Sequence, residues 1–166
     1  MIFSLMAAID GLIALFSLSG TSEQNARKLT WFKETWRQDA AIAGTTALAE
    51  QAGGTVKQKS RLIGAKLITG TATTANGTNF FTLLIDKRTA AVPGTPVNVI
   101  TFAADTPTTD DLAAFTAKDL VAYFTSTAAD LNFAEGDSYT VEVTKTGGSG
   151  LAFPIAQLEL IFEARD

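Results

Sequence analysis

The sequence contains neither cysteine nor histidine among its 166 residues. Without cysteine, the chain has no disulfide, no thiolate nucleophile and no cysteine-ligated metal. Without histidine, it lacks the commonest general base and the commonest metal ligand, so no familiar catalytic triad can be assembled. Paired carboxylates or a Ser–Lys arrangement would have to supply any catalysis, and no motif indicates either. We therefore expect a protein that is not an enzyme and that uses no cofactor.

The chain has no large excess of charge of one sign, because 13 basic residues nearly offset 17 acidic ones and leave a net charge of −4. Nucleic-acid phosphates are bound by clustered Lys and Arg. The nearest approach to such a cluster is Lys57, Lys59, Arg61 and Lys66, of which the first three would share one face of a strand. We interpret them as a solvated strand face and expect no nucleic-acid partner.

Acidic residues gather in the second half of the chain without the ligand spacing of a known calcium loop. Neighbouring carboxylates such as Asp110 and Asp111 would point apart on a helix or strand, which makes them a poor acid/base pair. Asp is favoured in turns and at helix caps. We expect those roles, and no metal site, for Asp105, Asp110, Asp111, Asp119, Asp130, Glu135 and Asp137.

Composition divides the chain near residue 44, into a helical N-terminal arm (1–43) and a β domain (44–166). Residues 1–18 carry an apolar stripe at helical spacing. A signal peptide would need a basic start, and no Lys or Arg precedes Arg27; a membrane span would need about twenty apolar residues, and Asp10 interrupts this run. We favour a helix that packs on another chain or on its own domain, through Ile2, Leu5, Met6, Ile9, Leu12, Ile13 and Phe16.

A second helix is expected over residues 23–41, where both tryptophans of the chain occur. Leu29, Phe32 and Trp36 are spaced by three and four residues and would form a stripe beside Trp31. The stripe could anchor the helix to its own subunit. It could equally be an intersubunit contact, because Trp is enriched at interface hot spots.

The rest of the chain predicts an antiparallel β-sandwich or jelly roll. Turn signals such as Asn76-Gly77 and Gly147-Gly148 separate short alternating runs. The run at 79–87 is apolar on both faces, so it should be central or pressed against another subunit. The last two strands are expected to pair as a closing hairpin. Strands are predicted at 45–51, 61–69, 79–87, 97–102, within 115–127, at 138–146 and at 156–163.

Two stretches carry a resemblance to a known family: RLIGAKLI at 61–68 with TTANGTNFFTLLIDKR at 73–88, and the Glu-Gly-Asp turn at 135–137 leading to Lys145 and Gly147. They resemble the core of small tailed-phage head proteins, the capsid decoration (cement) proteins and related head-fibre bases. The resemblance implies a homotrimer of β-sandwich subunits on the capsid surface of the virion. It implies contacts with the major capsid protein and with copies of itself, and no catalytic residues.

Two other functions fit the residues. A sandwich of this kind could be a head-fibre or host-adhesion module that binds carbohydrate, with Phe133, Tyr123 and Tyr139 as the candidate stacking aromatics. Alternatively, residues 1–18 could anchor a surface protein in a membrane. We expect the virion structural role, with no membrane partner.

Overall fold

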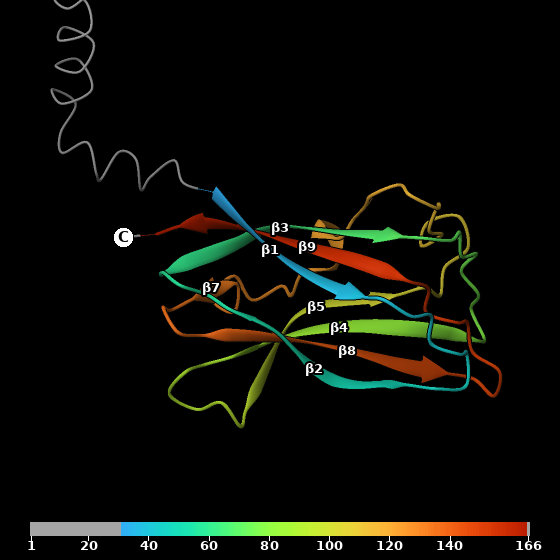
Figure 1. The fold of residues 1–166 in the computed structure, drawn as a ribbon, viewed down its shortest axis with the longest axis horizontal. Helices are drawn as coiled ribbons and strands as arrows, with labels where there is room; N and C mark the ends of the chain where they lie inside the picture. Colours follow the sequence, from blue (N-terminus) through green and yellow to red (C-terminus); the bar gives the residue numbers. More distant parts are fainter. Residues whose placement is uncertain (1–30, 166) are drawn as a thin grey trace, which may run out of the picture.

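In the computed structural model, which describes residues 31–165, the chain forms two antiparallel sheets packed face to face (Figure 1). The first sheet has the order β1 (Trp31–Gln38), β9 (Ala156–Ala164), β3 (Ser60–Thr69), β6 (Lys118–Asp119), and the short β7 (Asn132–Phe133) also pairs with β3. The second has the order β2 (Leu48–Thr55), β8 (Ser138–Thr146), β4 (Phe80–Arg88), β5 (Pro96–Ala103). The expected β-sandwich is confirmed.

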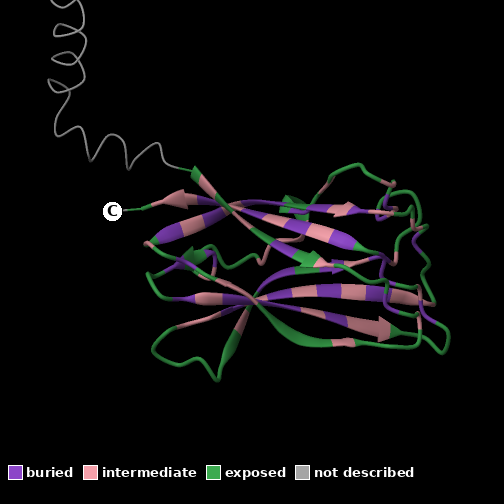
Figure 2. Cartoon of the chain, viewed as in Figure 1, coloured by how far each residue is buried: buried purple, intermediate pink, exposed green. Residues whose placement is uncertain are grey.

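The core lies between the two sheets and is built largely from alternate residues of β4, β8 and β9, whose buried and half-buried residues form alternating purple and pink bands in Figure 2. Phe81, Leu83 and Ile85 of β4 are fully buried, while the residues between them are half-buried. Because successive side chains of a strand point to opposite faces, one face of β4 forms the floor of the core. β4 lies between β8 and β5, as its two apolar faces predicted.

The helix expected over residues 23–41 is wrong for the part that the structure describes. Residues 31–38 form strand β1, which pairs antiparallel with β9 from Trp31 opposite Glu163 to Gln38 opposite Ala156. A spacing of four residues between Phe32 and Trp36 fits a helical stripe and also one face of a strand. The alternating burial of β1 shows that the strand period applies, so β1 is part of the sandwich although it precedes residue 44.

The expected closing hairpin is also wrong. β8 and β9 are adjacent in sequence, but β8 pairs with β2 and β4 while β9 pairs with β1 and β3 in the other sheet. Residues 147–155 therefore cross from one sheet to the other. The sheet to which a strand belongs depends on the strands that pair with it, and the alternation of apolar residues within one strand does not predict those partners.

The strand expected within residues 115–127 is reduced to the two-residue β6 and a 3₁₀ turn, η1 (Val121–Tyr123). The Asp119 carboxylate accepts a hydrogen bond from the Val121 amide at 2.8 Å, which turns the chain away from the sheet. The strands expected at 61–69, 79–87, 97–102, 138–146 and 156–163 are confirmed, whereas that expected at 45–51 begins at Leu48 and continues to Thr55.

Candidate functional site

The predicted contact residues that the structure describes lie on β1, and they divide between its two faces. Trp36 is only 6% exposed and belongs to the core of its own subunit. Phe32 lies on the same face and stacks on Phe162 with ring centroids 5.2 Å apart. Trp31 points outward and is 66% exposed. The remaining predicted residues lie outside the described part of the chain: Ile2, Leu5, Met6, Ile9, Leu12, Ile13, Phe16 and Leu29.

A second exposed aromatic, which the sequence did not single out as a contact, lies near the other end of β1. Phe115 is 81% exposed and has a φ of +57°, a left-handed conformation that bulky side chains rarely adopt. Its amide donates to the Thr69 carbonyl at 2.8 Å, and the preceding Ala114 forms a parallel bridge with Thr69. The sheet thus holds the Phe115 ring out from the surface.

Phe115 borders a shallow depression of about 290 Å³ together with Ile155, which is also exposed. Gln38, the last residue of β1, and Gln157 of β9, which pairs with the preceding Arg37, complete one wall. We call these four residues the Phe115 surface. It is an apolar projection bordered by amides and by the charged residues Arg37 and Asp39, and an apolar centre with a polar rim is typical of protein contact sites.

Several of the acidic residues accept hydrogen bonds from backbone amides, in the turn and cap roles that the sequence predicted. Asp111 accepts from the Ala75 amide at 2.8 Å, and Asp137 accepts from the Ala90 and Ala134 amides at 3.0 and 2.8 Å. Within residues 31–165, no group of three or more acidic residues is arranged to hold a metal ion. No helix in this part of the chain is long and apolar enough to cross a membrane.

The three aromatics considered for carbohydrate binding are not available for stacking. Phe133 and Tyr139 are buried in the core. Tyr123 is half-buried, its ring meets Phe102 edge-on, and its hydroxyl donates to Asp110. Burial, and then the Asp110 carboxylate, raise the pKa of Tyr123 to about 12.

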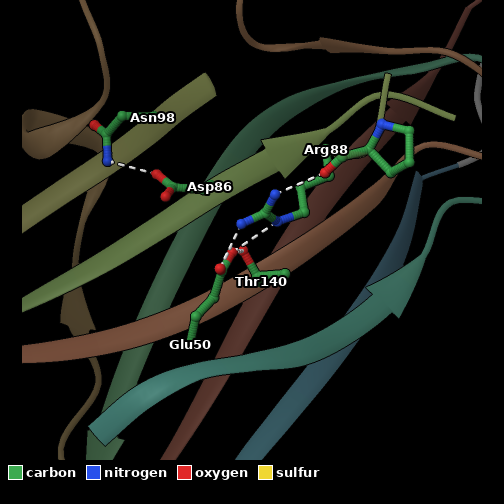
Figure 3. Close-up of polar contacts among 6 residues, drawn as sticks. Glu50, Asp86, Arg88, Asn98 and Thr140 are labelled. Carbon is green, nitrogen blue, oxygen red and sulfur yellow. Dashed lines mark hydrogen bonds and ion pairs between the residues drawn. The ribbon is translucent and has the colours of Figure 1, made fainter. Parts of the chain in front are cut away.

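The outer face of the second sheet carries a polar network that ties three strands together (Figure 3). Arg88 on β4 donates to both carboxylate oxygens of Glu50 on β2, and Thr140 on the intervening β8 donates to the same carboxylate. Arg88 also donates to the Pro93 carbonyl at 2.6 Å. The hydrogen bond from Arg88, and then that from Thr140, lower the pKa of the Glu50 carboxyl. Each group is satisfied within the sheet, so the network stabilises the fold.

At one end of the sandwich, buried polar residues continue the inward-facing apolar rows of three strands. Lys87 follows Ile85 on the inward face of β4, and Ser60 precedes Leu62 on that of β3. Asp137 precedes the inward Tyr139 of β8. All three residues are buried. This cluster was not among the predicted site residues, although Lys87 occupies a position where the alternation of β4 requires an apolar residue.

No protein-family model and no curated protein matches this chain. The solved structures that overlap with it in part include two of the same virus. A chain from the structure of infectious bursal disease virus Gx strain is 13% identical, with a TM-score of 0.41 over 80% of this chain and 32% of that chain. A chain from the Gt strain is 12% identical, with a TM-score of 0.35 over 82% and 38%. This chain spans only about a third of the length of those chains, 32% and 38% respectively. TM-scores below 0.5 carry no functional argument, so the function is inferred from the residues of this chain.

Proposed function

We propose that this protein is a structural component of a virion that decorates or cements the outside of a capsid, as a homotrimer that contacts the major capsid protein. The similarity of residues 61–88 and 135–147 to phage decoration proteins supports this proposal, and so does the sandwich fold that this similarity implied. The carboxylates of Asp111, Asp137 and Glu50 are hydrogen-bonded to backbone or to neighbouring side chains, which suits structural roles.

The observation that carries the proposal is the conformation of Phe115. A left-handed conformation costs an L-residue about 1–2 kcal/mol, and a large apolar ring held in water forgoes the stabilisation that burial would bring. Hydrogen bonds to β3 hold the loop in place despite both costs. A partner that covers Phe115 and Ile155 would recover the apolar contribution, and strained, over-determined residues are typical of functional positions.

Trp31 supplies a second contact point at the opposite end of β1 from the Phe115 surface. Eight residues of extended strand place the two ends about 23 Å apart. Trp31 is also where the sandwich joins residues 1–30, which hold the apolar stripe. Two separate contact surfaces suit a cement protein, since one can join copies of the chain while the other binds the shell.

The test is immunogold electron microscopy of intact particles, with antibodies raised against the sandwich. Labelling distributed over the outside of the capsid is the expected result. Labelling confined to fibre tips would favour the host-adhesion alternative, and particles that never carry the chain would contradict a virion role. Antibodies against the major capsid protein of the same particles are the positive control.

A further inference from the structure

A cleft opens between the two sheets at the end where the polar cluster lies. It has a volume of about 870 Å³, within the range of ligand-binding pockets. The first residues of β3, the last residues of β4 and β9, and the short β7 form its walls. This is the end of the sandwich at which β7 lies in Figure 1.

The walls of the cleft carry an excess of positive charge in a chain whose net charge is negative. Four cationic and two acidic residues line the cleft, and both carboxylates are already engaged. Asp137 accepts from two backbone amides, and Glu163 pairs with Arg165 at 2.6 Å. The other cationic residues of the walls are Lys59, Arg61 and Lys87.

Lys87 is the most unusual of these cations because it is only 7% exposed. Its ammonium group donates to the Asn132 carbonyl at 2.9 Å and lies 5.5 Å from the centre of the Phe133 ring. No carboxylate within residues 31–165 forms an ion pair with Lys87. An ammonium group has three donors, so the Asn132 bond leaves donor capacity directed at the cleft.

Ser60 is a second under-satisfied group in the same wall. The residue is 1% exposed, and its hydroxyl has no hydrogen-bond partner among the described residues. It shares the inward face of β3 with Leu62, so it points into the space between the sheets. Buried hydroxyls are nearly always hydrogen-bonded, so an orphaned one beside a cleft points to a bound water, ion or ligand group as its partner.

We propose that this cleft binds an oxyanion, a carboxylate or phosphate group of a small ligand. Lys87 supplies the positive charge, and the Ser60 hydroxyl donates a hydrogen bond to the bound oxygen. Hydrogen bonds between charged partners are stronger than neutral ones, and the low dielectric around Lys87 strengthens them further. The inference goes beyond the virion role, because the cleft and the Phe115 surface share no residue.

The test is titration of the full chain with inorganic phosphate and, separately, with citrate at constant ionic strength, followed by the amide NMR shifts of the cleft residues. Saturable shifts with phosphate alone identify a phosphate site, and saturable shifts with citrate alone identify a carboxylate site. Lys87→Met keeps the aliphatic stem and removes the charge, so binding should weaken about tenfold. Lys66→Met removes an exposed lysine from elsewhere on β3 and should leave binding unchanged.

Ser60→Ala provides a second test that separates binding from folding. Removal of an unsatisfied buried hydroxyl should leave the protein at least as stable, whereas binding should weaken several-fold. A purely structural serine would leave the anion affinity unchanged. Absence of saturable shifts with both anions, or an equal loss in Lys66→Met and Lys87→Met, would overturn the proposal.

Discussion

Glu50 on β2 and Arg88 on β4 are joined by two hydrogen bonds that pass over β8, the strand between them. β2 is the edge strand of its sheet, and its register with β8 shifts twice, between Leu48 and Gln51 and between Ala52 and Gly54. The backbone hydrogen bonds between β2 and β8 are therefore interrupted at two points. The side-chain bridge fastens β2 to the regular part of the sheet.

We predict that Glu50→Gln lowers the melting temperature at neutral pH by a few degrees and makes the melting temperature fall less as the pH is lowered. The pKa of Glu50 is lower in the folded protein than its ordinary value of 4.5. The stabilisation from this carboxylate is therefore present above pH 4.5 and is lost as the pH falls through the folded pKa. Thermal melts between pH 7 and pH 3 measure the effect. Glu135→Gln, in the exposed turn before β8, is the matched control and should leave the melting curve at pH 7 unchanged.

Truncation of the two tryptophans of β1 should change the stability of the protein by very different amounts. Trp36→Ala empties a core position and should lower the free energy of unfolding by about 3–5 kcal/mol. Trp31→Ala removes an exposed ring and should change it by no more than about 0.5 kcal/mol. Urea titrations measure both. Equal destabilisation would contradict the strand assignment, because a strand places the two side chains on opposite faces.

Tyr139 is a core residue whose hydroxyl has no hydrogen-bond partner in the described structure. Tyr139→Phe should therefore stabilise the protein by about 1 kcal/mol at neutral pH. Burial, and then the Glu34 charge, raise the pKa of Tyr139 to about 12. Because the folded pKa lies above the unfolded value of 10, stability is intact below pH 10 and is lost as the pH rises toward 12. Tyr139→Phe should therefore lose less stability between pH 10 and pH 12 than the unsubstituted protein. Denaturant unfolding between pH 9 and pH 12 provides the comparison.

Phe115→Asn should raise the stability of the protein and at the same time weaken its assembly. Asn tolerates the left-handed conformation, so the variant should be more stable by up to about 1 kcal/mol. It should also lose self-association or shell binding, because the exposed ring is gone. Val92→Asn, at an exposed apolar residue without left-handed backbone, is the control and should leave association intact. A Phe115 variant that assembles normally would remove the main support for the proposed function.

The strands that could be predicted from the sequence are those whose alternation is unambiguous. At 138–146 the inward Tyr139, Val141 and Val143 are buried as expected, and their neighbours on the other face are more exposed apart from Thr140, which lies beneath Glu50. β3 is less regular, since a shift between Leu62 and Gly64 resets its alternation. β1 could not be assigned because its apolar residues also fit a helix.

The contact surface and the cleft depend on tertiary structure to different extents. The left-handed conformation of Phe115 follows from hydrogen bonds to β3, some 46 residues earlier in the chain, and no local pattern encodes it. Lys87 and Asp137 could have been found, since each continues an alternating apolar row with a charged residue. Their proximity in one cleft, however, follows from how the two sheets pack.

The measurement that tests the central claim most directly is the solution mass of the full chain by light scattering on a sizing column. A subunit that works through contacts with its own copies should form a trimer, with a mass about three times 17.5 kDa. The same measurement on the chain from residue 31 onward, which keeps β1 and Trp36, locates the contact in the sandwich if the trimer persists. A full chain that stays at 17.5 kDa at every concentration would contradict the account.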